Sequence, residues 1–144
     1  MPAESLRGLL DTNIVILRHA IDPDELPDEM AISAVTLAEL SAGVHLVKGD
    51  SAEAIEERAR RADVLARVEN EFDPIAFETE SARIFGRISA AVQARGRTPR
   101  RRIADLMIAS TAAAAALPLY TTNPVDFDGL DGIIEVVAVR RPPL

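Results

Sequence analysis

Four acidic side chains stand beside apolar segments, and they are the residues of this sequence best suited to chemistry. Asp11 ends the apolar run of GLLDTNIVI, and Asp105 is the one acid of RIADLMIAS. Glu39 lies in VTLAELSAG, and Asp126 lies in TTNPVDF. Taking a carboxylate out of water costs free energy unless it is hydrogen-bonded, paired or bound to a metal. The four acids therefore mark either local structural features or the corners of a metal site.

Each acid also has a purely structural explanation. Asp11 suits the N-cap of a helix that begins after it, and Asp105 would lie in a first helical turn, where the helix dipole favours an acid. Asn123 begins an Asn-Pro turn, and Asp126 fits the loop that follows. Glu39 lies on a solvated helix face in this explanation, although no basic residue one turn away offers it an ion pair.

The order of apolar segments predicts an α/β fold. Short apolar runs favour strands at residues 6–10, 30–33, 72–76, 118–122 and 133–139. Helical periodicity favours helices at residues 34–47, 51–69, 78–95 and 102–116, of which the last is apolar nearly all round and should be buried. Strands that alternate with helices predict a short, mainly parallel sheet with helices on both faces, in a three-layer α/β/α arrangement.

A parallel sheet would give the acids a shared location. Ligands of such folds bind beyond the carboxyl ends of the strands, and both Asp11 and Asp126 follow predicted strands. Several carboxylates at one edge would repel each other unless a cation lay between them. An all-oxygen ligand set suits Mg²⁺, for which Mn²⁺ can substitute. We therefore expect a divalent-metal site at this edge of the sheet.

Composition narrows the class of protein. The chain has 144 residues, no cysteine and a net charge of −7. This length predicts a single domain over residues 1–144, and the missing cysteines exclude disulfides and thiolate zinc sites. Without a signal-peptide pattern or a membrane-length apolar run, we expect a cytoplasmic protein with no membrane contact. The acidic balance disfavours general polyanion binding, but RGRTPRRR at residues 95–102 concentrates arginines just before Asp105.

Two classes of phosphate-handling α/β protein are disfavoured by missing residues. A receiver domain needs a lysine in its acidic pocket, and Lys48 is the only lysine of the chain. A phosphatase of the haloacid dehalogenase type needs a second aspartate two positions after the first, where this chain has Asn13. The GxxxxGK[ST] phosphate loop is also missing. A metal-dependent hydrolase fits the acids better.

Four stretches together resemble the PIN-domain ribonucleases, in particular the VapC-like toxins of type II toxin–antitoxin modules. They are LLDTNIVI, ISAVTLAEL, RIADLMIAS and LYTTNPVDF, in the family's order and across essentially the whole chain. The resemblance implies a PIN-like fold in which Asp11, Glu39 and Asp105 hold Mg²⁺. Some relatives carry an acid where this chain has Asn123, and others use the position of Asp126. We favour Asp126 as the fourth acid, with Asn123 as a neutral ligand or a group beside the ligands.

The resemblance also implies partners and a reaction. Thr12 matches a hydroxyl position that orients the site. Such toxins are homodimers, are inhibited by a cognate antitoxin from the same operon, and cut structured RNA such as tRNA or rRNA. We expect Mg²⁺-assisted hydrolysis by water, with phosphate contacts from Arg97, Arg100, Arg101 and Arg102. The alternative is a catalytically silent PIN-fold module that binds RNA or a protein partner.

Overall fold

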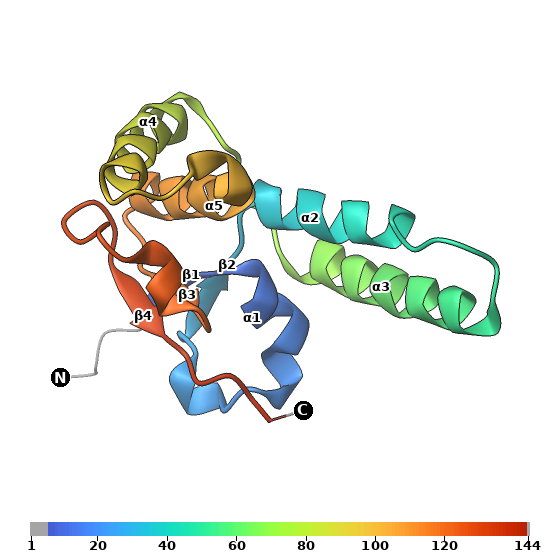
Figure 1. Cartoon of the computed structure of the whole chain (residues 1–144). Coiled ribbons are helices and arrows are strands. Elements are labelled where there is room, and N and C mark those ends of the chain that lie inside the picture. The colour runs from blue at the N-terminus through green and yellow to red at the C-terminus, as the bar shows by residue number, and fades with distance from the viewer. Residues whose placement is uncertain (1–5, 144) are drawn as a thin grey trace, which may run out of the picture.

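A short parallel sheet forms the centre of the molecule (Figure 1). The computed structural model describes residues 6–143, except the side chains of residues 100 and 101. The strands are β1 (Arg7–Leu10), β2 (Glu29–Ala31), β3 (Leu119–Thr121) and β4 (Val136–Ala138), in the order β2-β1-β3-β4 with every neighbouring pair parallel. Because β1 and β3 are the central strands, their carboxyl ends meet at the middle of one sheet edge. The predicted α/β fold with a parallel sheet is confirmed.

Helices fill most of the chain between the strands. The α-helices are α1 (Thr12–Leu17), α2 (Ala34–His45), α3 (Ala52–Glu71), α4 (Thr79–Ala94) and α5 (Ile103–Ala114). Short 3-10 helices are η1 (Arg18–Ala20), η2 (Pro23–Glu25), η3 (Pro99–Arg102) and η4 (Pro124–Phe127). The side chains of Ser33 and Ser51 cap α2 and α3 by accepting backbone hydrogen bonds. Within residues 6–143, no helix is both long and apolar enough to cross a membrane.

The helices cover both faces of the sheet, which makes three layers. Leu9 and Leu119 are paired in register and pack on one face against apolar side chains of α4 and α5. The next pair in register, Leu10 and Tyr120, packs on the other face against α1, α2 and α3. Successive side chains of a strand point to opposite faces, so each central strand contributes to both cores. This double packing fixes the carboxyl ends of β1 and β3, and Asp11 directly follows β1.

Helices α2 and α3 form a pair that projects from the sheet (Figure 1). The chain enters and leaves this pair at one point, where Ser33 and Ile75 form an isolated parallel bridge. Ala34 donates its backbone N–H to the carbonyl of Ile75 at 2.8 Å, and Ile75 donates to the carbonyl of Ile32 at 2.9 Å. The pair is therefore fastened to the body of the protein at its base.

One predicted strand is wrong and another is shorter than expected. In the segment 72–76 only Ile75 pairs, through the isolated bridge. The backbone N–H of Phe72 instead donates to the carbonyl of Val68 and ends α3. Pro74 has no backbone N–H with which to bond to a neighbouring strand. In the predicted segment 133–139, only residues 136–138 form a strand, which is β4. Ile133, the first residue of the segment, still belongs to the preceding turn.

Helix α5 is followed by a residue with a positive φ angle. Ala116 has φ of 56°, in the left-handed region where a Cβ is unfavourable. The N–H of Ala116 bonds to the carbonyl of Ala113 at 3.1 Å, and that of Leu117 bonds to Ala112 at 2.9 Å. These two bonds are those of a Schellman cap, in which glycine is the usual residue at the left-handed position. The end of α5 therefore holds an alanine in a strained conformation.

We expect Ala116→Gly to raise the free energy of unfolding by about 1 kcal/mol, because glycine adopts this conformation without the Cβ penalty. Urea denaturation followed by circular dichroism measures the change. The matched control is Ala115→Gly, at an ordinary φ of −85°, which should lower stability or leave it unchanged. A loss of stability in Ala116→Gly would contradict the assigned strain.

Candidate active site

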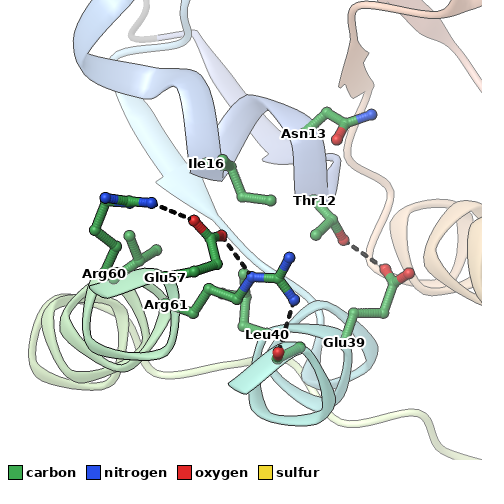
Figure 2. Close-up of a pocket in the computed structure, with 10 residues that line it drawn as sticks. Thr12, Asn13, Ile16, Glu39, Leu40, Glu57, Arg60 and Arg61 are labelled. Atoms are coloured by element: carbon green, nitrogen blue, oxygen red, sulfur yellow. Dashed lines mark hydrogen bonds and ion pairs between the residues drawn. The ribbon is translucent and has the colours of Figure 1, made fainter. Parts of the chain in front are cut away.

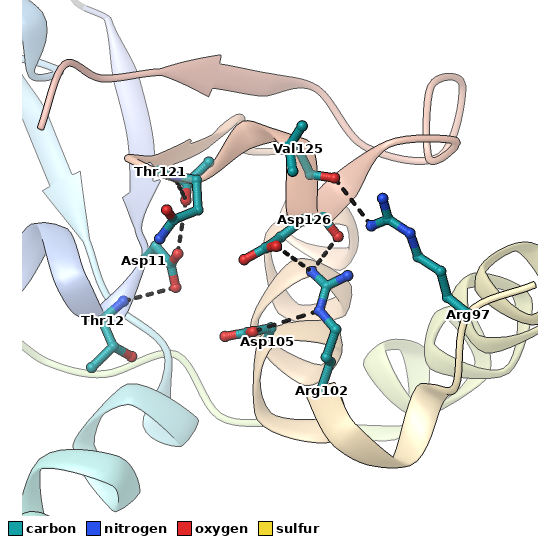
Figure 3. A network of polar contacts seen from close by, with 9 residues as sticks. Asp11, Thr12, Arg97, Arg102, Asp105, Thr121, Val125 and Asp126 are labelled. Carbon is teal, nitrogen blue, oxygen red and sulfur yellow. Dashed lines mark hydrogen bonds and ion pairs between the residues drawn. The ribbon is translucent and has the colours of Figure 1, made fainter. Parts of the chain in front are cut away.

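Asp11 lies at the carboxyl end of β1, and only 5% of its surface is exposed. Its Oδ1 accepts a hydrogen bond from the backbone N–H of Thr12 at 2.9 Å, which makes it the N-cap of α1. Its Oδ2 accepts from the hydroxyl of Thr121 at 2.8 Å (Figure 3). Thr121 ends β3, so the pairing of β1 with β3 sets this second bond. Asp11 is therefore a helix cap and also a carboxylate fixed at the sheet edge.

Glu39 is joined to the same edge through hydroxyl groups. The Thr12 hydroxyl donates to Oε1 of Glu39 at 2.6 Å (Figure 2), and its oxygen lies 3.0 Å from the hydroxyl of Thr36. Because Thr12 gives its one hydroxyl proton to Glu39, the Thr36 hydroxyl must be the donor to Thr12. Thr36 is fully buried on α2, three residues before Glu39. The two threonines thus hold the Glu39 carboxylate in place.

Arg102 lies between the other two acids (Figure 3). Its Nε is 3.9 Å from Oδ2 of Asp105, and its Nη2 is 3.7 Å from Oδ1 of Asp126. The same guanidinium donates a hydrogen bond to the backbone carbonyl of Asp126 and lies over the ring of Phe127. Both carboxylate distances are longer than a hydrogen bond, so the acids keep their oxygens for other ligands. With 17% of its side chain exposed, Arg102 is an internal cation.

The turn before η4 presents Asp126 to the site. The backbone N–H of Asn123 donates to the hydroxyl oxygen of Thr121 at 3.0 Å, and its carbonyl accepts from the N–H of Asp126 at 3.0 Å. The carboxylate of Asp126 points toward Asp11 and Asp105 (Figure 3). Asn123 therefore supports the site through its backbone.

Burial and neighbouring acids raise the pKa of two of the four carboxyl groups, those of Asp11 and Asp105. Burial raises the pKa of Asp11 above its ordinary value of 3.8, its two hydrogen bonds oppose the rise, and the charges of Glu39 and Asp126 add to it. Burial also raises the pKa of Asp105 above 3.8, and the charges of Asp11 and Asp126 add to the rise while Arg102 opposes it. The folded protein thus holds these carboxylates against both desolvation and like-charge repulsion.

The arginines predicted to contact RNA differ in their surroundings. Arg97 is half-buried and donates to the carbonyl of Val125 at 3.1 Å. Arg102 faces the acids, as described above. The side chains of Arg100 and Arg101 lie outside the described part of the structure. A role in RNA binding stays a prediction for all four.

Two threonines at this site were not singled out from the sequence. Thr121 supports Asp11, and Thr36 supports Glu39 through Thr12. The helical spacing of Thr36 and Glu39 places them on one face, which is a signal available in the sequence. Thr121 is the last residue of a strand, and its contact with Asp11 spans 110 positions along the chain. Only the strand order reveals that contact.

The chemistry of the donor set fits a hard divalent cation. The four acids supply only oxygen ligands, and the pKa of Asp11 and of Asp105 stays raised despite the hydrogen bonds to Asp11 and the charge of Arg102 beside Asp105, so a cation would relieve the remaining cost. Within residues 6–143, no three His, Cys, Asp or Glu side chains form a ready-made group of metal ligands. Mg²⁺ usually keeps several waters and binds proteins through one or two carboxylates, so it does not require such a group.

Comparison with known proteins places the chain among similar sequences and folds. The PIN domain family model matches residues 8–133. The chain is 35% identical over 136 residues to Ribonuclease VapC5 of Mycobacterium tuberculosis, covering 92% of this chain and 94% of that protein. The crystal structure of VapBC-5, a toxin–antitoxin system of the same organism, matches with TM-score 0.75 and 34% identity over 94% of this chain and 98% of that one. DNA-bound VapBC from Salmonella typhimurium matches with TM-score 0.68 and 25% identity, over 91% and 96% of the two chains.

We expect Asp11→Asn to raise the melting temperature of the metal-free protein by a few degrees at pH 7. A carboxyl group whose pKa is raised by folding destabilises the fold as the pH rises above its unfolded value, near 3.8, and asparagine removes that effect while it keeps the helix cap. Thermal denaturation at pH 7 and at pH 4, close to the unfolded pKa, measures the difference, which should shrink at the lower pH.

The control for this substitution is Asp73→Asn, at an exposed position after α3. Its melting temperature should match that of the unmodified protein at both pH values. A destabilised Asp11→Asn would mean that the hydrogen bonds to the charged carboxylate outweigh its desolvation.

Proposed function

The chain belongs to the PIN-domain family, and we propose that it is a metal-dependent endoribonuclease, the toxin of a type II toxin–antitoxin pair. The observation that carries the proposal is the gathering of acids at the carboxyl edge of the sheet, where Asp11 and Asp105 are held at a cost in desolvation and in repulsion from neighbouring carboxylates. Binding RNA, a polyanion, gives no reason to gather carboxylates, whereas binding Mg²⁺ does.

In this proposal each acid has a role set by its surroundings. Asp11 and Asp105 would hold Mg²⁺, or Mn²⁺ in its place, because burial raises the pKa of both carboxyl groups and a bound cation would offset that cost of desolvation. Glu39, oriented by the Thr12 hydroxyl, and Asp126, oriented by η4, would complete the site from opposite sides. The cation would supply the Lewis acidity that polarises the scissile phosphate and lowers the pKa of the attacking water.

The carboxylates would also accept the proton that the attacking water loses. One of the four carboxylates would act as general base and take the proton of the attacking water, because a water bound among the four acids would lie beside their carboxylate oxygens. A water nucleophile needs no help from the ribose 2′-hydroxyl. The products would therefore be a 5′-phosphate and a 3′-hydroxyl, and structured RNA such as tRNA or rRNA would be the substrate.

The arginines near the acids would bind the phosphates of the substrate. Arg97, with Arg100 and Arg101, would contact the backbone beside the cut and offset the acidic remainder of the protein. Arg102 would act at shorter range, since its guanidinium already lies between Asp105 and Asp126. We infer that it limits the repulsion of these two acids before a metal or a phosphate arrives.

The proposed partner is a cognate antitoxin. VapBC-5 is a member of the VapBC family of toxin–antitoxin systems and the Salmonella typhimurium structure is also a VapBC, and this chain resembles both over nearly its whole length. We extend the proposal to a homodimer that acts in the cytoplasm, on the analogy of the family alone.

The second candidate is a catalytically silent PIN-fold module that binds RNA or a protein. The observation in its favour is Arg102, because a cation already placed between two acids could replace a metal permanently. The two candidates differ in whether the purified protein cuts RNA and in whether it binds Mg²⁺.

We expect the purified protein to cut a pool of small structured RNAs at discrete positions with Mg²⁺ or Mn²⁺, and EDTA to abolish cutting. Asp11→Asn should lower the rate by about 100-fold or more, because it removes a proposed ligand of the cation. Sequencing of the cut ends and a test for 5′-phosphates measure the site and the chemistry.

The control is again Asp73→Asn, which should cut at the same positions and rate as the unmodified protein. Equal cutting by a folded Asp11→Asn would point to a contaminating nuclease or a different site. No cutting by antitoxin-free protein on several RNA pools would favour the silent module.

We expect Arg102→Met to lower the melting temperature of the metal-free protein and to enlarge the rise that Mg²⁺ produces. Methionine removes the internal cation, so repulsion between Asp105 and Asp126 increases, and a bound cation would then relieve more of it. Thermal denaturation with and without Mg²⁺ measures both effects. A smaller Mg²⁺ effect in the variant would mean that Arg102 serves mainly to place η4.

A further inference from the structure

A groove of about 580 Å³ opens beside the acids, between α1 and the α2–α3 pair (Figure 2). Thr12 and Glu39 line one end of it, so the groove is continuous with the candidate active site. Its volume lies within the range of small-ligand pockets. A substrate whose scissile phosphate lies at the acids would therefore have this groove next to the bond that is cut.

The groove has an apolar wall in which one side chain is far more exposed than a core position. Ile16 on α1 is 50% exposed and faces the groove, and Leu40 and Val64 line it from α2 and α3. Such a wall suits a flat apolar surface that arrives from solution. The face of a nucleobase is one such surface.

Gly43 keeps the opposite side open. It lies inside α2, where glycine is less favourable than alanine. A Cβ at this position would meet its first neighbour, Nη1 of Arg61, only at 3.8 Å, which is ordinary van der Waals contact. Packing therefore does not require glycine here. Its visible effect is to leave space in the groove.

Arg61 supplies a fixed cation on the same side. Its Nε donates to Oε1 of Glu57 at 2.8 Å, and its Nη1 donates to the carbonyl of Gly43 at 2.8 Å. These bonds hold the guanidinium so that its third nitrogen points toward the side where Ile16 and Thr12 lie (Figure 2). A guanidinium carries further N–H donors beyond these two, and such donors match the acceptor edge of a base.

We propose that this groove seats one unpaired nucleotide of the RNA, adjacent to the scissile phosphate. Its base would pack on Ile16, and Arg61 would donate to its acceptor atoms. This proposal rests on the proposed ribonuclease function and adds a position at which the substrate sequence is read. Among the described side chains lining the groove none is aromatic, so a guanidinium and an aliphatic wall replace the stacking platform of many RNA-binding proteins.

Direct binding tests the groove without any cutting. The probes are the 5′-monophosphates of adenosine, guanosine, cytidine and uridine, with ribose 5-phosphate as the probe that lacks a base. In amide NMR spectra of metal-free protein, we expect at least one mononucleotide to shift the signals of Ile16, Gly43 and Arg61, and ribose 5-phosphate to leave them unchanged. Equal shifts with ribose 5-phosphate, or no shifts in the groove with any nucleotide, would overturn the proposal.

A filled groove provides the second test. Gly43→Leu should remove the nucleotide-induced shifts and lower RNA cutting by about 10-fold or more, the scale of one lost base contact. Gly86→Leu is the matched control, since Gly86 lies on an exposed face of α4 with nothing near its Cβ position. The rise in melting temperature with Mg²⁺ should be the same in both variants, which verifies that the acids are intact.

The two tests separate this inference from the ribonuclease proposal. Nucleotide binding in the groove of a protein that cuts no RNA would overturn the ribonuclease function and support the groove as a nucleotide site. RNA cutting at the unmodified rate, with unmodified base preference, by Gly43→Leu would overturn the groove proposal and leave the ribonuclease function standing.

Discussion

The buried carboxylate of Asp11 is the constraint on which the rest of the structure depends. A charge at this depth is retained because two hydrogen bonds reach it, one from the first residue of α1 and one from the end of β3. The bond from Thr12 is local to the start of α1, whereas the bond from Thr121 exists only when β1 and β3 lie side by side in their observed register. The cores on the two faces of the sheet fix that register, so the packing of the whole protein supports one carboxylate.

The acids are held from two sides by different chemistry. On the side of α2, hydroxyl groups of two threonines orient Glu39 without adding charge. On the side of α5, the guanidinium of Arg102 adds a positive charge between Asp105 and Asp126. A cation entering the group would therefore meet neutral support on one side and a competing charge on the other.

Most of the fold and the positions of the acids follow from sequence patterns, whereas the contacts that orient the acids do not. Helical periodicity locates α2 to α5 within a few residues, and the rule that sites lie at the carboxyl ends of parallel strands places Asp11 and Asp126 together. The strand predicted at residues 72–76 fails because Pro74 and the cap of α3 remove the donors that a ladder needs. The bond from Thr121 to Asp11 depends on strand order, which local pattern does not encode.

The bridge between Ser33 and Ile75 gives the α2–α3 pair a degree of independence. Everything between these two residues leaves and rejoins the body at one place, and only the sheet-proximal part of the pair reaches the core or Glu39. The distal turn, near residues 46–51, lies away from the sheet edge that carries the candidate acids. The outer end of the pair is therefore the part of the fold where inserted or exchanged residues would least displace the acids.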